Sequence, residues 1–161
     1  MARFDPSIPA LDGSPLWIQA CSLGEVNTVR PLVEALRVRW PDRPVLVTVS
    51  TLSGHERAQA LFGAANVAWF PFDTRPAVRH FLDAARPKML ILVETELWPN
   101  VISECRRRTI PVVIVNGRLS DKHLARYQRL RRWYRPLVAG LSAVGMQTEA
   151  HASRIRELGA M

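Results

Sequence analysis

The sequence predicts an α/β fold, with an open, doubly wound and mostly parallel sheet of the Rossmann-like type. Short apolar runs rich in β-branched residues alternate with longer stretches of helical periodicity. The apolar runs are nearly continuous, as in strands that are buried on both faces of a parallel sheet. About six alternations in one domain's length of chain imply right-handed βαβ crossovers.

An irregular lead rich in proline and turn residues is expected at residues 1–15, followed by one domain over residues 16–161. The predicted strands are Leu16–Cys21, Val45–Val49, Val67–Pro71, Met89–Val93, Val112–Val115 and Ser142–Met146. The stretch VNTVRPLVEALRVRW predicts a helix after the first strand, with Val26, Val29, Val33 and Leu36 on its apolar face.

Composition limits the possible functions. The net charge of +8 favours anionic partners, namely nucleic acid, anionic lipid or a phosphorylated metabolite. The start MARFDPSIPA lacks the apolar core of a signal peptide, and no apolar run approaches the roughly 20 residues that span a bilayer. Cys21, Cys105 and four scattered histidines do not have the spacing of a disulfide framework or metal site. We therefore expect reduced thiols, no metal and no membrane-spanning segment.

In such sheets, ligands bind at the carboxyl ends of the strands, where helix N-termini attract anions. The first such junction is CSLGEV, in which Ser22 and Glu25 fit the S-x-x-E capping box. Ser53 and Glu56 repeat that pattern. Alternatively, the helix dipole keeps Glu25 ionised, so that it accepts a proton from a bound hydroxyl, while Gly24 allows a ligand close to the backbone.

The second junction is ETELWPN. Glu94 and Glu96 follow a buried strand and lie on the same side if the chain stays extended, and Pro99 is suited to the first position of a helix. Acids so close to a hydrophobic strand need partners. They either bind a ligand or form ion pairs with arginine residues of the chain.

The third junction is VNGRLSDKH. Asn116, Gly117 and Arg118 leave the fifth strand, and Ser120 or Asp121 is expected to cap the next helix. Arg118 is suited to a bidentate contact with phosphate or carboxylate, although a surface role is the simpler alternative.

One basic amphipathic helix is predicted over DKHLARYQRLRRWYRPLVAG. Its apolar stripe consists of Leu124, Tyr127, Leu130, Tyr134 and Leu137, and its cations are Lys122, Arg126, Arg129, Arg131, Arg132 and Arg135. Such a helix either lies on an anionic membrane surface or packs on the domain with a solvated basic face. No helix-turn-helix, zinc spacing or aromatic strand platform supports nucleic acid as the partner.

The junctions together carry a family resemblance. WIQACSLGEV, TLSGHERAQALFG, PFDTRPAVRHFLDAARPKMLILVETELWPN, RRRTIPVVIVNGRLS and the closing ELGA follow one another in order. From about Trp17 to its end, the chain resembles the amino-terminal half of bacterial 3-deoxy-D-manno-octulosonic acid (Kdo) transferase. The resemblance implies the amino-terminal domain of a GT-B glycosyltransferase.

The resemblance also implies an activity. These enzymes transfer Kdo from CMP-Kdo to a hydroxyl of the lipid A precursor, with inversion and without a cofactor or metal, at the cytoplasmic face of the bacterial inner membrane. The family's proton acceptor corresponds to Glu25, and the acid that stabilises its transition state corresponds to Glu94. The amino-terminal half recognises the acceptor lipid, while CMP-Kdo is held mostly by a carboxyl-terminal half.

Other residues are candidates for substrate binding: Ser22, Gly24, Arg57, Glu96, Asn116 and Arg118. Among them, Arg57 and Arg118 are our own inference for contacts with lipid A phosphates. The chain departs from the family at Gln19, where His is usual, and it lacks the usual amino-terminal anchor and the nucleotide-sugar half. We therefore expect a peripheral, incomplete enzyme, inactive alone. The alternative is a non-catalytic lipid- or protein-binding module on the same fold.

Overall fold

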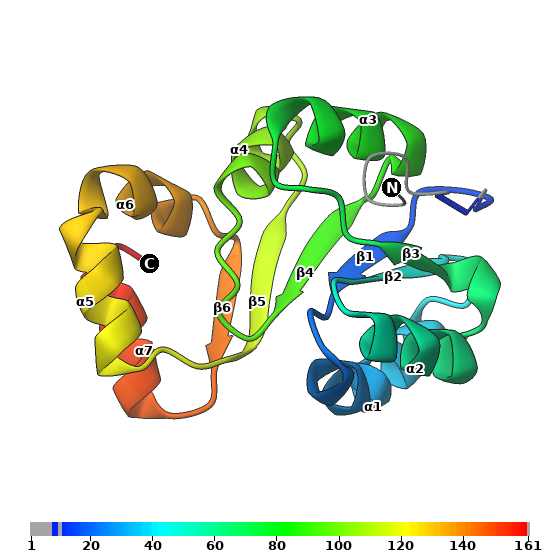
Figure 1. Cartoon of the computed structure of the whole chain (residues 1–161), viewed down its shortest axis with the longest axis horizontal. Helices are drawn as coiled ribbons and strands as arrows, with labels where there is room; N and C mark the ends of the chain where they lie inside the picture. The colour runs from blue at the N-terminus through cyan, green and yellow to red at the C-terminus, as the bar shows by residue number, and fades with distance from the viewer. Residues whose placement is uncertain (1–7, 10, 161) are drawn as a thin grey trace.

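The computed structural model describes residues 8, 9 and 11–160, so positions 1–7 and 10 of the expected lead lie outside the described residues. The described residues form a parallel sheet of six strands in the order β3-β2-β1-β4-β5-β6 (Figure 1). The strands are β1 (Leu16–Gln19), β2 (Val45–Val49), β3 (Val67–Trp69), β4 (Met89–Val93), β5 (Val112–Gly117) and β6 (Ala143–Met146). The predicted fold class is confirmed.

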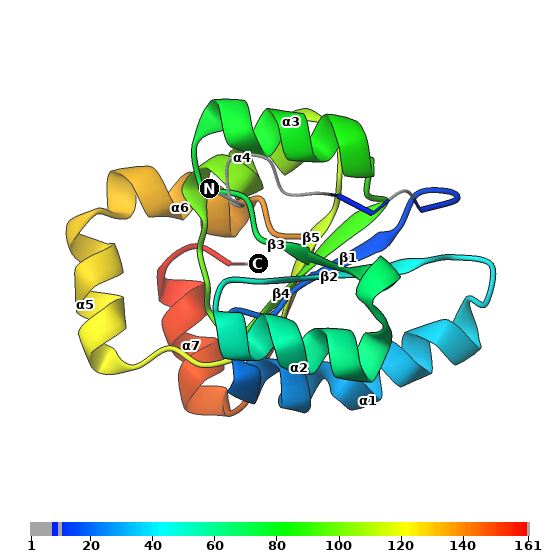
Figure 2. The same cartoon turned by 45° about the vertical axis from the view of Figure 1, so that its right-hand side comes forward.

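Helices cover both faces of the sheet. They are α1 (Leu23–Arg39), α2 (Leu52–Phe62), the short 3₁₀ helix η1 (Ala64–Asn66), α3 (Arg75–Ala85), α4 (Pro99–Arg107), α5 (Asp121–Arg129), α6 (Arg131–Ala139) and α7 (Glu149–Glu157). Figure 2 shows α1 and α2 on one face and α3 on the other. No helix among the described residues is both long and apolar enough to cross a bilayer.

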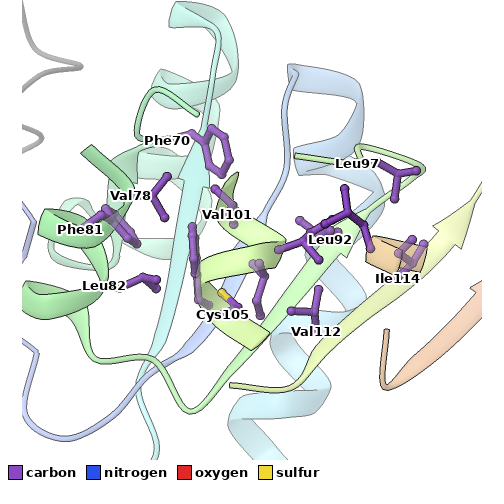
Figure 3. Packing of buried hydrophobic residues seen from close by; sticks show 14 of the residues in the cluster. Phe70, Val78, Phe81, Leu82, Leu92, Leu97, Val101, Cys105, Val112 and Ile114 are labelled. Carbon is purple, nitrogen blue, oxygen red and sulfur yellow. The ribbon is translucent and has the colours of Figure 1, made fainter. Parts of the chain in front are cut away.

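The hydrophobic core has two parts, one on each face of the sheet. Val26, Val29 and Val33 of α1 are buried against the strands together with α2, as the helical periodicity predicts. The larger part joins the other face to α3, α4, α6 and α7. Within it, the rings of Trp17 and Phe81 lie 4.6 Å apart. Figure 3 shows side chains of α3 and α4 packed together over the strands in this part of the core.

The order of the strands creates a switch point beside β1. The chain moves outward from β1 through β2 to β3, then returns to the other side of β1 and continues through β4 to β6. Leu16 accordingly pairs with Val45 on one side and with Met89 on the other. The crevice at the carboxyl ends of two such strands is where open α/β sheets bind ligands.

The single basic helix predicted over residues 121–140 is wrong, because the chain bends at Leu130 between α5 and α6. In a straight helix, Tyr127 and Tyr134 would lie two turns apart, with a rise of about 10.5 Å along the axis between their Cα atoms. With the bend, their ring centroids lie 4.6 Å apart. Leu130 is 45 % exposed and leaves the predicted apolar stripe, while Leu137 is buried.

Candidate active site

Glu25 caps helix α1, in a variant of the predicted capping box. Ser22 is the N-cap, and its hydroxyl oxygen accepts from the Glu25 amide at 3.5 Å. The Glu25 carboxylate accepts from the Ser22 hydroxyl at 3.1 Å and from the Cys21 amide at 2.8 Å, rather than from the Ser22 amide. The carboxylate is therefore held in a fixed position at the end of β1.

The repeated pattern at Ser53 and Glu56 does not form a capping box. Helix α2 begins two residues earlier than this pair requires, and its N-cap is Thr51, whose hydroxyl accepts from the Gly54 amide at 3.3 Å. Gly54 is buried, and a Cβ there would lie 2.6 Å from the Val49 side chain of β2 and 3.1 Å from the backbone nitrogen of Leu23, at the start of α1. The glycine therefore permits a close approach of the two helices.

Glu94 and Glu96 do not lie on an extended chain. The prediction that an extended backbone puts their side chains on the same side is therefore wrong. Glu94 has a φ of +58°, in the left-handed region, and its amide donates to the Val115 carbonyl at 3.0 Å. Among the described residues, neither acid forms an ion pair with an arginine. Pro99 opens helix α4, as predicted.

The three acids lie within electrostatic range of one another. Burial raises the pKa of Glu25, and the charges of Glu94 and Glu96 raise it further against the two hydrogen bonds that lower it. Burial and the charge of Glu94 also raise the pKa of Glu96, while His123 lowers it. Because Glu25 follows β1 and Glu94 follows β4, these acids flank the switch point of the sheet.

Sequence reasoning missed Asp73, which fixes the start of helix α4. Its carboxylate accepts from the amides of Asn100 and Val101 at 3.3 and 2.9 Å, and the Asn100 side chain donates to the Asp73 carbonyl at 2.6 Å. Trp98, the N-cap of α4, has no capping bond of its own. No local pattern reveals this cap, since it comes from the loop before α3.

The remaining predicted residues are dispersed. Arg57 is exposed on α2, where it donates to the Asn27 side chain at 2.8 Å. Arg118 is exposed beyond β5. Asn116 has a φ of +54°, and its carbonyl accepts from the side-chain nitrogen Nε2 of Gln147 at 3.3 Å. Gly24 is open to solvent, since a Cβ there would meet only the Ser22 hydroxyl, at 3.8 Å. Ser120 caps α5 as expected.

Gln19, where the resembling family has His, is fully buried at the end of β1. Its side-chain oxygen accepts from the Thr48 hydroxyl at 2.5 Å, and its nitrogen donates to the Ser50 hydroxyl at 3.2 Å. Thr48 also accepts from the Trp17 indole at 2.8 Å. Gln19 thus belongs to a hydrogen-bond network that links β1 to β2.

Comparisons with known proteins identify the family of the chain. A family model described as 3-deoxy-D-manno-octulosonic-acid transferase (kdotransferase) matches residues 2–161. The chain is 37 % identical over 158 residues to 3-deoxy-D-manno-octulosonic acid transferase of Bordetella pertussis, with 94 % of this chain and 36 % of that protein covered. It is 34 % identical over 145 residues to the protein of the same name in Haemophilus influenzae, covering 89 % of this chain and 34 % of that protein.

A relative with another name also matches. The bifunctional glycosyltransferase/methyltransferase of Fusobacterium nucleatum is 33 % identical over 153 residues, covering 93 % of this chain and 24 % of that protein. The chain thus spans about a third or less of the length of these curated relatives. It belongs to the 3-deoxy-D-manno-octulosonic-acid transferase (kdotransferase) family, whose amino-terminal domain it matches.

Proposed function

We propose that this chain is the acceptor-binding amino-terminal part of an inverting glycosyltransferase that moves Kdo from CMP-Kdo to a hydroxyl of a lipid A precursor. One observation supports this most. Glu25 and Glu94 follow β1 and β4, the two strands that flank the switch point of the sheet. The names of the relatives agree with this reaction class.

Glu25 is the proposed general base. Its two oxygens accept from Cys21 and Ser22, which orients the carboxylate while each oxygen keeps a second lone pair for the acceptor hydroxyl. Burial and the neighbouring acids raise its pKa, which makes it a stronger base than an exposed glutamate. The hydroxyl oxygen bonds to the anomeric carbon of Kdo as its proton passes to Glu25.

Glu94 is the proposed electrostatic stabiliser. As the bond between the anomeric carbon and the CMP phosphate oxygen breaks, that oxygen leaves with the electron pair and the sugar acquires oxocarbenium-like positive charge. A fixed carboxylate lowers the energy of such a state because it does not have to reorient. The bond from the Glu94 amide to Val115 holds the backbone that carries this group. CMP-Kdo itself is assigned to a carboxyl-terminal half.

An anionic membrane surface is the proposed partner of helices α5 and α6, which we call the α5–α6 pair. This pair carries exposed cations, and Trp133 beside them is 74 % exposed. Aromatic and basic side chains together favour the interface of an anionic bilayer. The protein would then act as a peripheral protein at the cytoplasmic face of the inner membrane, where the resemblance places the family's acceptor lipid.

A chimera tests this function. The chain replaces the matching segment of the Bordetella pertussis relative, and transfer of Kdo to acylated lipid A precursor is measured with CMP-Kdo as donor. We expect the chimera to be active and the isolated chain to be inactive. Glu25→Gln and Glu94→Gln each lower the rate about 10²-fold or more. Glu34→Gln, which breaks an exposed ion pair with Arg30, is the control.

Unchanged transfer by the Glu25→Gln chimera would refute its role as base. A folded chimera that transfers no Kdo would refute the proposed function of the chain. The fold of every variant is checked by circular dichroism, because Glu25 also caps α1.

A further inference from the structure

A cleft of about 430 Å³ lies between the segment that follows β4 and the α5–α6 pair. Glu96 and Trp98 line it from the segment, and His123, Arg126, Tyr127 and Tyr134 line it from the two helices. The cleft adjoins the candidate active site, because Thr95 and Glu96 in its lining directly follow Glu94 in the chain. None of the four helix residues is among the predicted site residues.

The aromatic part of the lining is suited to the carbon face of a ring-shaped ligand. Tyr127 and Tyr134 are half-buried, and their rings are tilted by 51° with centroids 4.6 Å apart. Each offers apolar ring surface together with a hydroxyl that donates and accepts hydrogen bonds. This combination of flat apolar surface and hydroxyl groups is complementary to a sugar.

Charges of both signs line the cleft. Arg126 is exposed and, among the described residues, forms no ion pair, so its guanidinium is available to an anion. Glu96 lies within electrostatic range of His123 and Tyr127. A bare anion in the cleft would meet repulsion from the Glu96 carboxylate. A ligand that carries both an anionic group and hydrogen-bond donors satisfies both kinds of side chain.

Trp98 forms an aromatic part of the cleft wall, and its ring centroid lies 4.9 Å from that of Phe70. Its indole Nε1 is buried and has no hydrogen-bond partner among the described residues. Because this nitrogen has no exposed surface, a ligand in the cleft does not contact it, and Trp98 contributes only aromatic surface to the wall.

We propose that this cleft binds a phosphorylated sugar, with Arg126 and His123 at the phosphate, Tyr127 and Tyr134 along the ring, and Glu96 at its hydroxyl groups. This inference rests on the proposed function in one respect: the sugar is taken to be the head of the acceptor, which carries the reacting hydroxyl. It assigns acceptor recognition to residues on α5 and α6, rather than to Arg57 or Arg118.

The test is a binding titration of the chain with glucosamine 1-phosphate, followed in two-dimensional amide NMR spectra. Glucosamine and inorganic phosphate are titrated separately, which distinguishes a sugar phosphate from a simple anion. We expect saturable binding of glucosamine 1-phosphate with shifts at Glu96, Arg126 and Tyr134. Arg126→Ala and Tyr134→Leu each raise its Kd about tenfold. Arg129→Ala removes an exposed arginine of the same helix that does not line the cleft, and it leaves the Kd unchanged.

Three results overturn the proposal: no saturable binding, equal affinity for inorganic phosphate, or an Arg126→Ala variant that binds as the original chain does. Arg126 is exposed, so its loss does not threaten folding and the test does not depend on Tyr134 alone. The chimera separates this inference from the proposed function. If the chimera is active but the cleft does not bind the sugar phosphate, only the proposed binding site is refuted. If the cleft binds it but the chimera is inactive, only the proposed transfer reaction is refuted.

Discussion

The Thr95 hydroxyl donates to the Arg118 carbonyl at 2.7 Å and accepts from the Arg118 amide at 2.9 Å. The last residues paired between β4 and β5 are Val93 and Val115. Just beyond them, the Thr95 side chain makes the two hydrogen bonds that a neighbouring backbone would otherwise make. The left-handed residues Glu94 and Asn116 lie between that register pair and the Thr95 contact. Thr95 thus anchors the segment that carries Glu94 and Glu96.

Thr95→Val is expected to lower the free energy of unfolding by about 1 kcal/mol, because valine keeps the shape and loses both hydrogen bonds. The effect is modest, since water reaches the exposed Arg118 backbone. Urea unfolding measures it. In the chimera, the same change lowers the rate of transfer by releasing Glu94. Thr95→Ser restores the hydroxyl and is expected to recover both properties, and failure to do so would argue against the hydrogen bonds as the cause.

Asp73→Ala is expected to lower the free energy of unfolding by about 1–2 kcal/mol, the usual cost of losing a helix cap. The change leaves the amides of Asn100 and Val101 without their acceptor. Asp83→Ala is the matched control, because Asp83 forms an exposed ion pair with Arg108 that should contribute less than about 1 kcal/mol. Urea unfolding measures both variants. Equal losses in the free energy of unfolding would contradict the role of Asp73 as the cap of α4.

Local patterns were sufficient to predict most of the sheet. The bounds of β2 and β4 agree with the apolar runs Val45–Val49 and Met89–Val93, because a strand buried on both faces has to be apolar at every position. The pair Ser22 and Glu25 likewise identified the start of a helix, since its bonds lie within one turn.

What the sequence did not reveal depends on contacts between distant segments. Thr95 and Arg118 are 23 residues apart, and Asp73 and Val101 are 28 residues apart, so no short pattern links them. The left-handed Glu94 has no glycine to signal it. The bend at Leu130 allows the contact between Tyr127 and Tyr134, whereas the apolar stripe fits a straight helix equally well.

The pKa of Glu25 is expected to lie above its ordinary value of 4.5 and to fall toward it in Glu96→Gln, which removes one like charge. In that variant, burial is the main remaining cause of the raised pKa of Glu25. Because the folded state binds this proton more tightly than the unfolded state, the contribution of Glu25 to stability falls as the pH rises from 4.5 through the folded pKa. Carbon-13 NMR titration of the carboxyl group measures the pKa directly. A value at or below 4.5 would contradict the electrostatic environment described above.

Binding to anionic vesicles is expected to depend on the α5–α6 pair. Arg131→Gln with Arg132→Gln should weaken the partition onto phosphatidylglycerol vesicles by about tenfold or more, since each cation near such a surface contributes about 1 kcal/mol. Trp133→Ser should weaken it further. The control changes Arg39 and Arg43 to Gln, at the other end of the molecule beside Trp40. Co-sedimentation at low and high salt measures the partition, and equal losses in both double variants would indicate a nonspecific effect of net charge.

Two glycines at the starts of neighbouring helices should respond oppositely to alanine. Gly54→Ala places a Cβ 2.6 Å from Val49 and 3.1 Å from the backbone nitrogen of Leu23, and overpacking of this kind costs about 1–3 kcal/mol. Gly24→Ala makes only an ordinary contact with the Ser22 hydroxyl, at 3.8 Å, and should leave the free energy of unfolding unchanged or raise it by at most about 1 kcal/mol, because alanine favours helix. If Gly24 allows the acceptor to approach the backbone beside Glu25, the same variant lowers transfer in the chimera while the fold keeps its stability. A Gly24→Ala chimera with full activity would remove Gly24 from the site and leave the assignment of Glu25 intact.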